Sequence, residues 1–196
     1  MSTIILIRHG STPANEQWLY CGQTDVSLSE QGAAALEEKR RAGGYPDVTG
    51  YRVYTSGLRR TEETLRILFG ELPHETEPLL KEISFGIYEM KSWFQMEHDA
   101  DFLYWTEHSQ ECAPEGGESG EEMRGRVLEG FRKIAERGED ALIVIHGGPI
   151  ASIMDSLFPG EGKNRYDWQP TGGEGYALTM EGAKAVGYRK IPETGE

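Results

Sequence analysis

The stretch that decides the fold is Ile4-Ile5-Leu6-Ile7-Arg8-His9-Gly10. Four consecutive apolar residues, mostly β-branched, are typical of a strand that is buried on both faces of a sheet. This strand ends in Arg8, His9 and Gly10. A guanidinium presents a planar set of donors that matches phosphate oxygens, and a glycine lets backbone N–H groups approach an anion. The strand end therefore predicts a phosphate site, in which a neutral His9 could attack phosphorus.

Similar strand and helix patterns alternate along the rest of the chain. Residues 141–146 repeat the buried-strand pattern, and residues 51–55 form a third such run. Apolar residues at helical spacing predict helices over about 30–42, 57–69 and 119–137. This alternation predicts an α/β protein. Two further segments, about 174–180 and 184–190, are predicted edge strands, and the residues from Ile191 to Gly195 are predicted to be a frayed terminus.

The length of the chain and one irregular segment define its organisation. A chain of 196 residues suits a single domain, here residues 1–196. Residues 82–117 are rich in aromatic side chains and lack a regular pattern. We predict that this segment is a cap-like insertion that carries one helix and arches over the sheet.

Composition excludes several classes of partner. The chain has 33 acidic and 20 basic residues, and its formal charge of -13 argues against a nucleic-acid or anionic-membrane surface. Any anionic ligand must therefore meet a local basic pocket. No apolar run suits a membrane span or a secretory core, and Cys21 and Cys112 lie far apart, in no metal or disulfide spacing. These features predict a cytoplasmic protein.

Two strands are predicted to end in His-Gly, at His9 and at His146. The carboxyl ends of neighbouring parallel strands form the ligand crevice of an open sheet, so both imidazoles are expected in one pocket. A third strand end leads into a helix whose first turn holds Arg59, which is predicted to be a second phosphate clamp. Arg60 projects about 100° further around the helix and is predicted to be a surface charge.

Together these motifs resemble the histidine phosphatase superfamily, which includes the cofactor-dependent phosphoglycerate mutases. The resemblance covers nearly the whole chain and rests on the order and spacing of the motifs. They are Arg8-His9-Gly10 with Thr12 and Asn15; Gly22, Asp25 and Leu28 before Ser29-Glu30-Gln31-Gly32; Ser56 and Arg59 with Thr61 and Thr64; Leu80-Lys81-Glu82-Ile83 followed by Phe85, Gly86 and Glu89; Pro114 and Gly116-Gly117-Glu118-Ser119 before Arg126; and His146-Gly147-Gly148.

The resemblance implies a fold and a set of residue roles. The fold is a three-layer α/β/α sandwich with a mostly parallel central sheet. His9 would carry a covalent phosphoryl group, and Glu82 would be the proton donor. The phosphate would be bound by Arg8, Arg59, His146 and Asn15, and further substrate-binding positions would be Gly147, Cys21 and Gly22. Glu89, seven residues after Glu82, remains a rival acid.

These roles suit phosphoryl transfer, in which equatorial oxygens must be held and the leaving oxygen protonated. Two arginines and a second imidazole would hold the oxygens, so no metal and no cofactor is expected. The expected partner is a small phosphorylated substrate, and a homodimer is left open. Four aromatic residues are predicted near the mouth of the site, where they would suit a neutral or ring-bearing leaving group: Trp18, Tyr20, Trp93 and Trp105.

The cap separates the possible activities. Between Ser92 and Ser119 the chain has seven acidic residues and no lysine or arginine. A mutase must hold a second anionic group, which such a wall would repel. We therefore predict a metal-independent phosphatase. The alternatives are a phosphoglycerate mutase-type transferase and a non-catalytic phosphate-binding protein.

Overall fold

A computed structural model describes residues 1–193 and contains a six-stranded sheet in the order β3-β2-β4-β1-β5-β6. β1 pairs in parallel with β4, β4 with β2, and β2 with β3, whereas β5 is antiparallel to both of its neighbours. The predicted mostly parallel sheet is therefore confirmed. The strands are β1 (Ser2–Arg8), β2 (Arg52–Thr55), β3 (Glu75–Thr76), β4 (Ala141–Ile145), β5 (Gly175–Glu181) and β6 (Lys184–Ile191).

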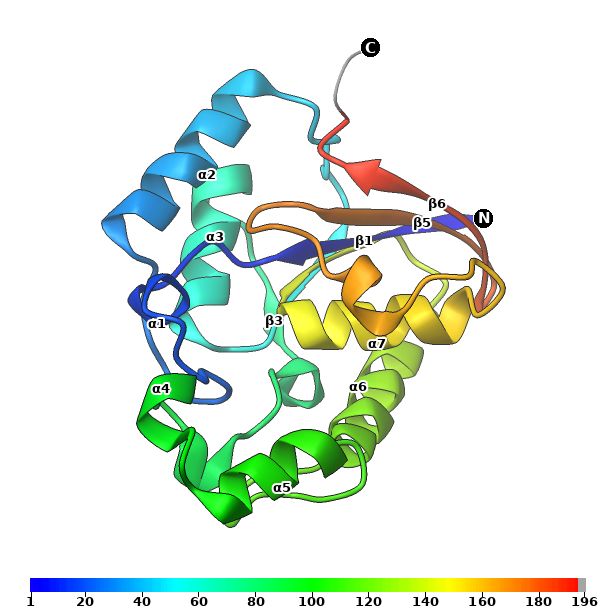
Figure 1. Ribbon diagram of the computed structural model, residues 1–196. Coiled ribbons are helices and arrows are strands. Elements are labelled where there is room, and N and C mark those ends of the chain that lie inside the picture. Colours follow the sequence, from blue (N-terminus) through cyan, green and yellow to red (C-terminus); the bar gives the residue numbers. More distant parts are fainter. Residues whose placement is uncertain (194–196) are drawn as a thin grey trace.

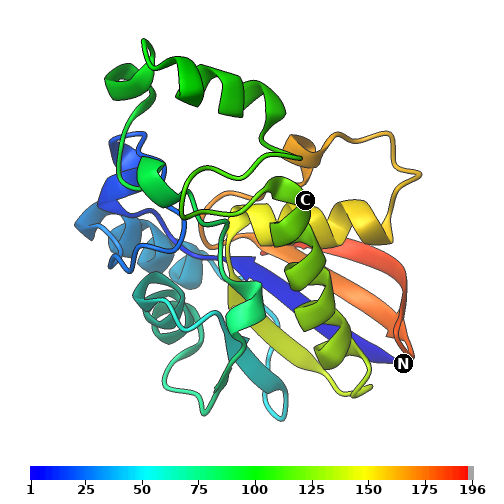
Figure 2. The ribbon, with the colours of Figure 1, turned by 90° about the horizontal axis from the view of Figure 1, so that it is seen from below.

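The sheet is sandwiched between two layers of helices, as Figures 1 and 2 show. Alternate residues of β1 supply both cores: Ile4 and Leu6 pack toward α6 and α7, and Ile5 and Ile7 pack toward α2 and α3. This burial on both faces explains the continuous apolar run. The helices are α1 (Pro13–Glu16), α2 (Glu30–Ala42), α3 (Arg59–Phe69), α4 (Trp93–Met96), α5 (Ala100–His108), α6 (Gly120–Ala135) and α7 (Gly147–Leu157), with short 3-10 turns η1 (Pro78–Leu80), η2 (Gly86–Tyr88) and η3 (Arg165–Trp168).

The carboxyl-terminal strands differ from the prediction. β5 is not an edge strand, because it lies between β1 and β6. Ile191 ends β6 and is buried, so it does not belong to a frayed terminus. Glu193, in the same prediction, donates its N–H to the carbonyl oxygen of Gly44 at 2.9 Å, whereas Thr194 and Gly195 lie outside the described residues. β3 was not predicted, since a two-residue strand leaves no periodic pattern.

The segment 82–117 contains η2, α4 and α5 and so has more helix than the single helix predicted. It encloses a small aromatic core of its own, formed by Tyr88, Met96, Phe102 and Trp105. Figures 1 and 2 both show α4 and α5 set apart from the sheet. The segment joins the body of the molecule through the loop after α1, where Leu19 pairs with Ser92. We call residues 85–117 the cap; Glu82, at the start of the segment, accepts from the N–H of Gly148 at the beginning of α7 and is not counted with it.

Candidate active site

The carboxyl ends of β1 and β4 bring the two predicted histidines together. In the parallel register Arg8 lies beside Ile145, so His9 and His146 follow neighbouring strand ends. Their ring centroids are 5.1 Å apart, in an edge-to-face arrangement. Both side chains are buried. The two imidazoles therefore meet as the strand ends predicted, although His9 lines a cavity and the fully buried His146 does not line that cavity.

His9 is held in one tautomer. Its Nδ1 lies 2.6 Å from the carbonyl oxygen of Gly10. A carbonyl can only accept, so Nδ1 carries the hydrogen and Nε2 keeps its lone pair. Burial, followed by the charge of Arg60, lowers the pKa of His9 to about 3, although the bond to Gly10 acts in the opposite direction. The imidazole is therefore neutral at physiological pH, as a nucleophile must be.

His146 is completely buried at the start of α7. Its Nε2 lies 2.8 Å from the Ser56 hydroxyl, which follows β2. Its Nδ1 has no hydrogen-bond partner among residues 1–193. Burial and the neighbouring His9 hold the pKa of His146 well below its ordinary value. A buried polar atom without a partner is costly, so an oxyanion that accepted a hydrogen bond from Nδ1 would be favoured.

The structure corrects the prediction for the two adjacent arginines of α3. Arg59 is on the surface, where its Nε lies 3.1 Å from Asp25 and its side chain is 65% exposed. Arg60 is 1% exposed, and its charge lowers the pKa of both histidines. Its guanidinium donates to the carbonyls of Thr24 (3.0 Å) and Gly22 (2.7 Å). The cation beside the imidazoles is therefore Arg60, and Arg59 is the surface charge.

The phase of α3 explains this error. Arg60 lies on the same helix face as Thr64 and Leu68, four and eight residues later, and both of these are buried. Arg59 begins the helix, one position earlier, and points away from that face. The i, i+4, i+8 pattern was available in the sequence and would have identified Arg60.

Glu82 extends from the loop after η1 toward the start of α7. Its carboxylate accepts from the N–H of Ile83 (2.9 Å) and from the N–H of Gly148 (3.1 Å). A Cβ at Gly148 would lie 2.4 Å from Glu82 Oε1, so only glycine permits this approach. Gly148 is a site residue that the prediction did not include, although it stood in the quoted His-Gly-Gly motif.

Glu89, the rival acid, has a structural role. Its carboxylate accepts from the backbone N–H groups of Gly22, Gln23 and Phe85 and from the Thr24 hydroxyl. These bonds fix the loop whose carbonyls hold Arg60. Gly22 is buried with both its N–H and its carbonyl bonded, so it supports the site from behind rather than facing a substrate.

Arg8, Asn15 and Cys21 have side chains or backbone at the cavity surface. Arg8 donates to the carbonyl of Pro170 at 2.8 Å, and burial lowers its pKa. A Cβ on Gly147 would lie 3.3 Å from the Arg8 guanidinium, in close contact. The Asn15 amide oxygen accepts from Thr12, which leaves its NH2 group as a donor. Cys21 is half-buried, and burial raises its pKa.

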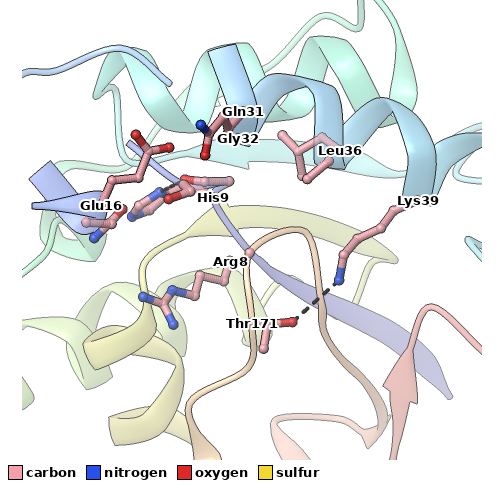
Figure 3. Close-up of a pocket in the computed structure, with 13 residues that line it drawn as sticks. Arg8, His9, Glu16, Gln31, Gly32, Leu36, Lys39 and Thr171 are labelled. Carbon is pink, nitrogen blue, oxygen red and sulfur yellow. Dashed lines mark hydrogen bonds between the residues drawn. The ribbon is translucent and has the colours of Figure 1, made fainter. Parts of the chain in front are cut away.

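Two cavities meet at Arg8 and Asn15, which line both. The first, of about 440 Å³, reaches from His9 along α2 to Lys39. Figure 3 shows the Arg8 and His9 side chains extending in the same direction from the end of β1, with Lys39 bonded to Thr171 at the other end of this cavity. The second, of about 660 Å³, contains Glu82 and lies between the strand ends and the cap.

The 660 Å³ cavity has an aromatic wall drawn from the loop after α1, the cap and η3. Trp105, predicted at the mouth, is instead buried in the cap core. None of the seven acidic residues between Ser92 and Ser119 lines the cavity. The prediction of an acidic wall facing the substrate is therefore wrong in its geometry. The aromatic residues of the wall are Trp18, Tyr20, Phe85, Trp93 and Tyr166.

Within residues 1–193, no group of three or more histidine, cysteine, aspartate or glutamate side chains is arranged to hold a metal ion. None of the helices in the same range has the length and apolar character needed to cross a membrane.

Comparisons with known proteins agree with this geometry. A 2,3-bisphosphoglycerate-dependent phosphoglycerate mutase from Parvibaculum lavamentivorans is 32% identical over 168 residues, which are 79% of each chain. An adenosylcobalamin/alpha-ribazole phosphatase from Salmonella typhimurium is 31% identical over 161 residues, 78% of this chain and 77% of the relative. The crystal structure of the alpha-ribazole phosphatase from Shigella flexneri superposes with a TM-score of 0.82 at 26% identity, covering 93% of each chain. The family model of the histidine phosphatase superfamily (branch 1) matches residues 4–185, and the chain belongs to this family.

Proposed function

We propose that this protein is a phosphomonoester hydrolase that works through a phosphohistidine on His9. The observation that carries the proposal is the neutral His9 imidazole, whose hydrogen is committed to Gly10 and whose pKa is lowered by burial and by the charges of the buried Arg60 and the half-buried Arg8. Its relatives include phosphatases, among them a metal-independent phosphoserine phosphatase from Arabidopsis thaliana that is 29% identical over 164 residues.

The phosphoryl group would be held by side chains that have spare donors. Arg8 and Arg60 each use part of the guanidinium on backbone carbonyls and retain further N–H groups. When Ser56 donates to His146 Nε2, the hydrogen of His146 resides on Nδ1, the atom without a protein partner. These groups would supply the positive charge that stabilises the equatorial oxygens of the transition state.

In the first step, His9 Nε2 attacks phosphorus and the bond between phosphorus and the ester oxygen breaks. Glu82 as the carboxylic acid gives its proton to the leaving alkoxide, which departs as the alcohol. The N–H groups of Ile83 and Gly148 then stabilise the resulting carboxylate. In the second step, this carboxylate takes a proton from water, whose oxygen attacks phosphorus. The N–P bond breaks, which releases phosphate and restores neutral His9.

Hydrolysis is favoured over mutase chemistry by the makeup of the 660 Å³ cavity. A mutase must hold a second anionic group firmly enough to retain a bisphosphorylated intermediate, which calls for several cations. Among the described lining residues, Arg165 is the single cation apart from Arg8, and the cap contributes the aromatic Phe85 and Trp93. The aromatic wall suits a small phosphorylated metabolite whose alcohol part has an apolar surface. We place this activity in the cytoplasm, in keeping with the free thiols Cys21 and Cys112.

Phosphate release from p-nitrophenyl phosphate tests the proposal, with His9→Ala against His98→Ala, whose imidazole is an exposed surface group. We expect steady turnover in the parent with a chelator present, unchanged turnover in His98→Ala, and a loss of at least about 10³-fold in His9→Ala. A phosphoryl label that is labile in acid and stable in alkali should form on the parent protein and should not form on His9→Ala. Equal turnover in the parent and His9→Ala would refute the mechanism. Formation of 2-phosphoglycerate from 3-phosphoglycerate with a trace of 2,3-bisphosphoglycerate would favour the mutase.

A further inference from the structure

Arg165 places a second positive charge in the substrate cavity, beyond the phosphate end. It belongs to η3, in the connection between α7 and β5, and it lines the 660 Å³ cavity together with Tyr166 and Gln169. Arg8 lines the same cavity where it meets the cavity that contains His9. The cavity therefore has one cation where it meets the cavity that contains His9 and another on its η3 side.

The Arg165 guanidinium has no carboxylate partner among residues 1–193. Its one side-chain hydrogen bond in that range is with the amide oxygen of Gln110, at 3.3 Å. The nearby Asp167 carboxylate accepts instead from the N–H of Asn164, at 2.8 Å. In a chain with 33 acidic and 20 basic residues, an arginine that lines a cavity and forms no ion pair within residues 1–193 is available to bind an anion.

The position of Arg165 is fixed by the fold. Asn164 caps η3 through the N–H groups of Tyr166 and Asp167. Trp168, at the other end of η3, is 1% exposed, and its ring lies 4.0 Å from the Lys163 amine. The anchored backbone places the start of the Arg165 side chain beside the cavity, so only the rotamers of the side chain need to be ordered when a ligand binds.

We propose that Arg165 forms a subsite for a second oxyanion, a carboxylate or a phosphoryl group, on the alcohol part of the substrate. The inference rests on the proposed function and specifies the substrate class: phosphomonoesters with a further anionic group. The acidic residues of the cap do not oppose this, because none of them lines the cavity. Arg165 would donate two parallel hydrogen bonds to the oxyanion, and the aromatic wall would contact the rest of the alcohol.

Matched substrates isolate the contribution of the second anion. Initial rates are measured for phenyl phosphate, 4-carboxyphenyl phosphate and 1,4-phenylene bisphosphate. A second pair, phosphoethanolamine and phosphoserine, places the additional carboxylate closer to the phosphoryl group. The preference is the ratio of kcat/KM for the anionic substrate to that for its neutral partner. The variants are Arg165→Gln, Arg165→Lys and, as a control with the same charge change, Arg41→Gln on the exposed end of α2.

In Arg165→Gln the preference for at least one anionic substrate should fall about tenfold, mainly through KM, as expected for the loss of charged hydrogen bonds at a partly exposed site. Arg165→Lys should keep part of the preference for the anionic substrate, and Arg41→Gln should keep all of it. Added salt should weaken this preference in the parent. An unchanged ratio in Arg165→Gln for every pair, with turnover that still depends on His9, would overturn this inference and leave the proposed function intact. Turnover that did not depend on His9 would overturn the proposed function itself.

Discussion

The strand-end region and the cap differ in how firmly their side chains are held. At the carboxyl ends of the strands, His9, His146 and Arg60 are buried. Around the cap, large aromatic side chains remain exposed, such as Trp18 at 83% and Phe94 at 78%. Preorganised charges stabilise a transition state best, whereas contacts to the variable part of a substrate tolerate exposure. The difference indicates that the strand ends determine the reaction and the cap side of the cavity determines the substrate.

The sharpest test of this contrast compares two glutamates. Glu82→Gln removes the proposed acid, so kcat/KM for phenyl phosphate, which reports the steps up to the phosphohistidine, should fall about 10³-fold. The loss of kcat/KM should be much smaller for p-nitrophenyl phosphate, whose leaving group needs no proton, whereas kcat should fall for both substrates because the same carboxylate activates water. Glu89→Gln weakens the loop that holds Arg60 and should lower the free energy of unfolding by about 2 kcal/mol. Urea unfolding measures the stability of Glu89→Gln, and steady-state kinetics with the two substrates measure the activity of both variants. A Glu89→Gln variant with the same dependence on the leaving group as Glu82→Gln would contradict the assignment.

The two adjacent arginines give the next largest effect. Arg60→Gln should lower kcat/KM about 10²-fold, because it removes a buried charge beside the transferring phosphoryl group. Arg59→Gln should change kcat/KM less than about twofold, since its partner Asp25 is an exposed surface group. The ratio of the two variants is the informative measurement. Equal losses would mean that Arg59 reaches the substrate after all.

The buried histidines should make stability depend on pH. The folded protein keeps His9 neutral down to about pH 3, whereas an unfolded histidine binds a proton below about pH 6.5. The contribution of His9 to the free energy of unfolding is therefore fully present above pH 6.5 and is lost as the pH falls toward 3, by about 2 kcal/mol at pH 5. Urea unfolding from pH 7 to pH 4.5 should show a shallower pH slope for His9→Gln than for the parent. His98→Gln serves as the control, and an unchanged slope in His9→Gln would contradict the burial argument.

The smallest effect is expected in the cap. Trp93 lines the 660 Å³ cavity and packs edge-on against Phe102, whereas the next residue, Phe94, is exposed and does not line it. Trp93→Leu should raise KM for phenyl phosphate about threefold with little change in kcat. Phe94→Leu should leave both constants unchanged. A fall in kcat for Trp93→Leu would show that the cap also takes part in the reaction step.

The sequence predicted those features that depend on local patterns. The continuous apolar runs identified β1 and β4, and each His-Gly pair followed directly from its strand. The mistakes involve orientation and distance. Helix phase decided which of Arg59 and Arg60 faces the histidines. Glu89 was a rival acid in the sequence because most of the donors to its carboxylate, in the loop at Gly22, are more than sixty residues away.

The sequence by itself determined the α/β class, the strands β1, β2 and β4 and the meeting of His9 with His146, since hydrophobic periodicity and the rule for parallel strand ends are local or nearly so. Only the tertiary structure decided that Arg60 lies beside the imidazoles, that Glu82 lines the cavity and that Arg165 lines it as well. Those properties depend on the direction of each side chain and on contacts between distant segments. A list of charges along the cap therefore predicted an acidic wall, while the folded chain turns those carboxylates away and presents Arg165.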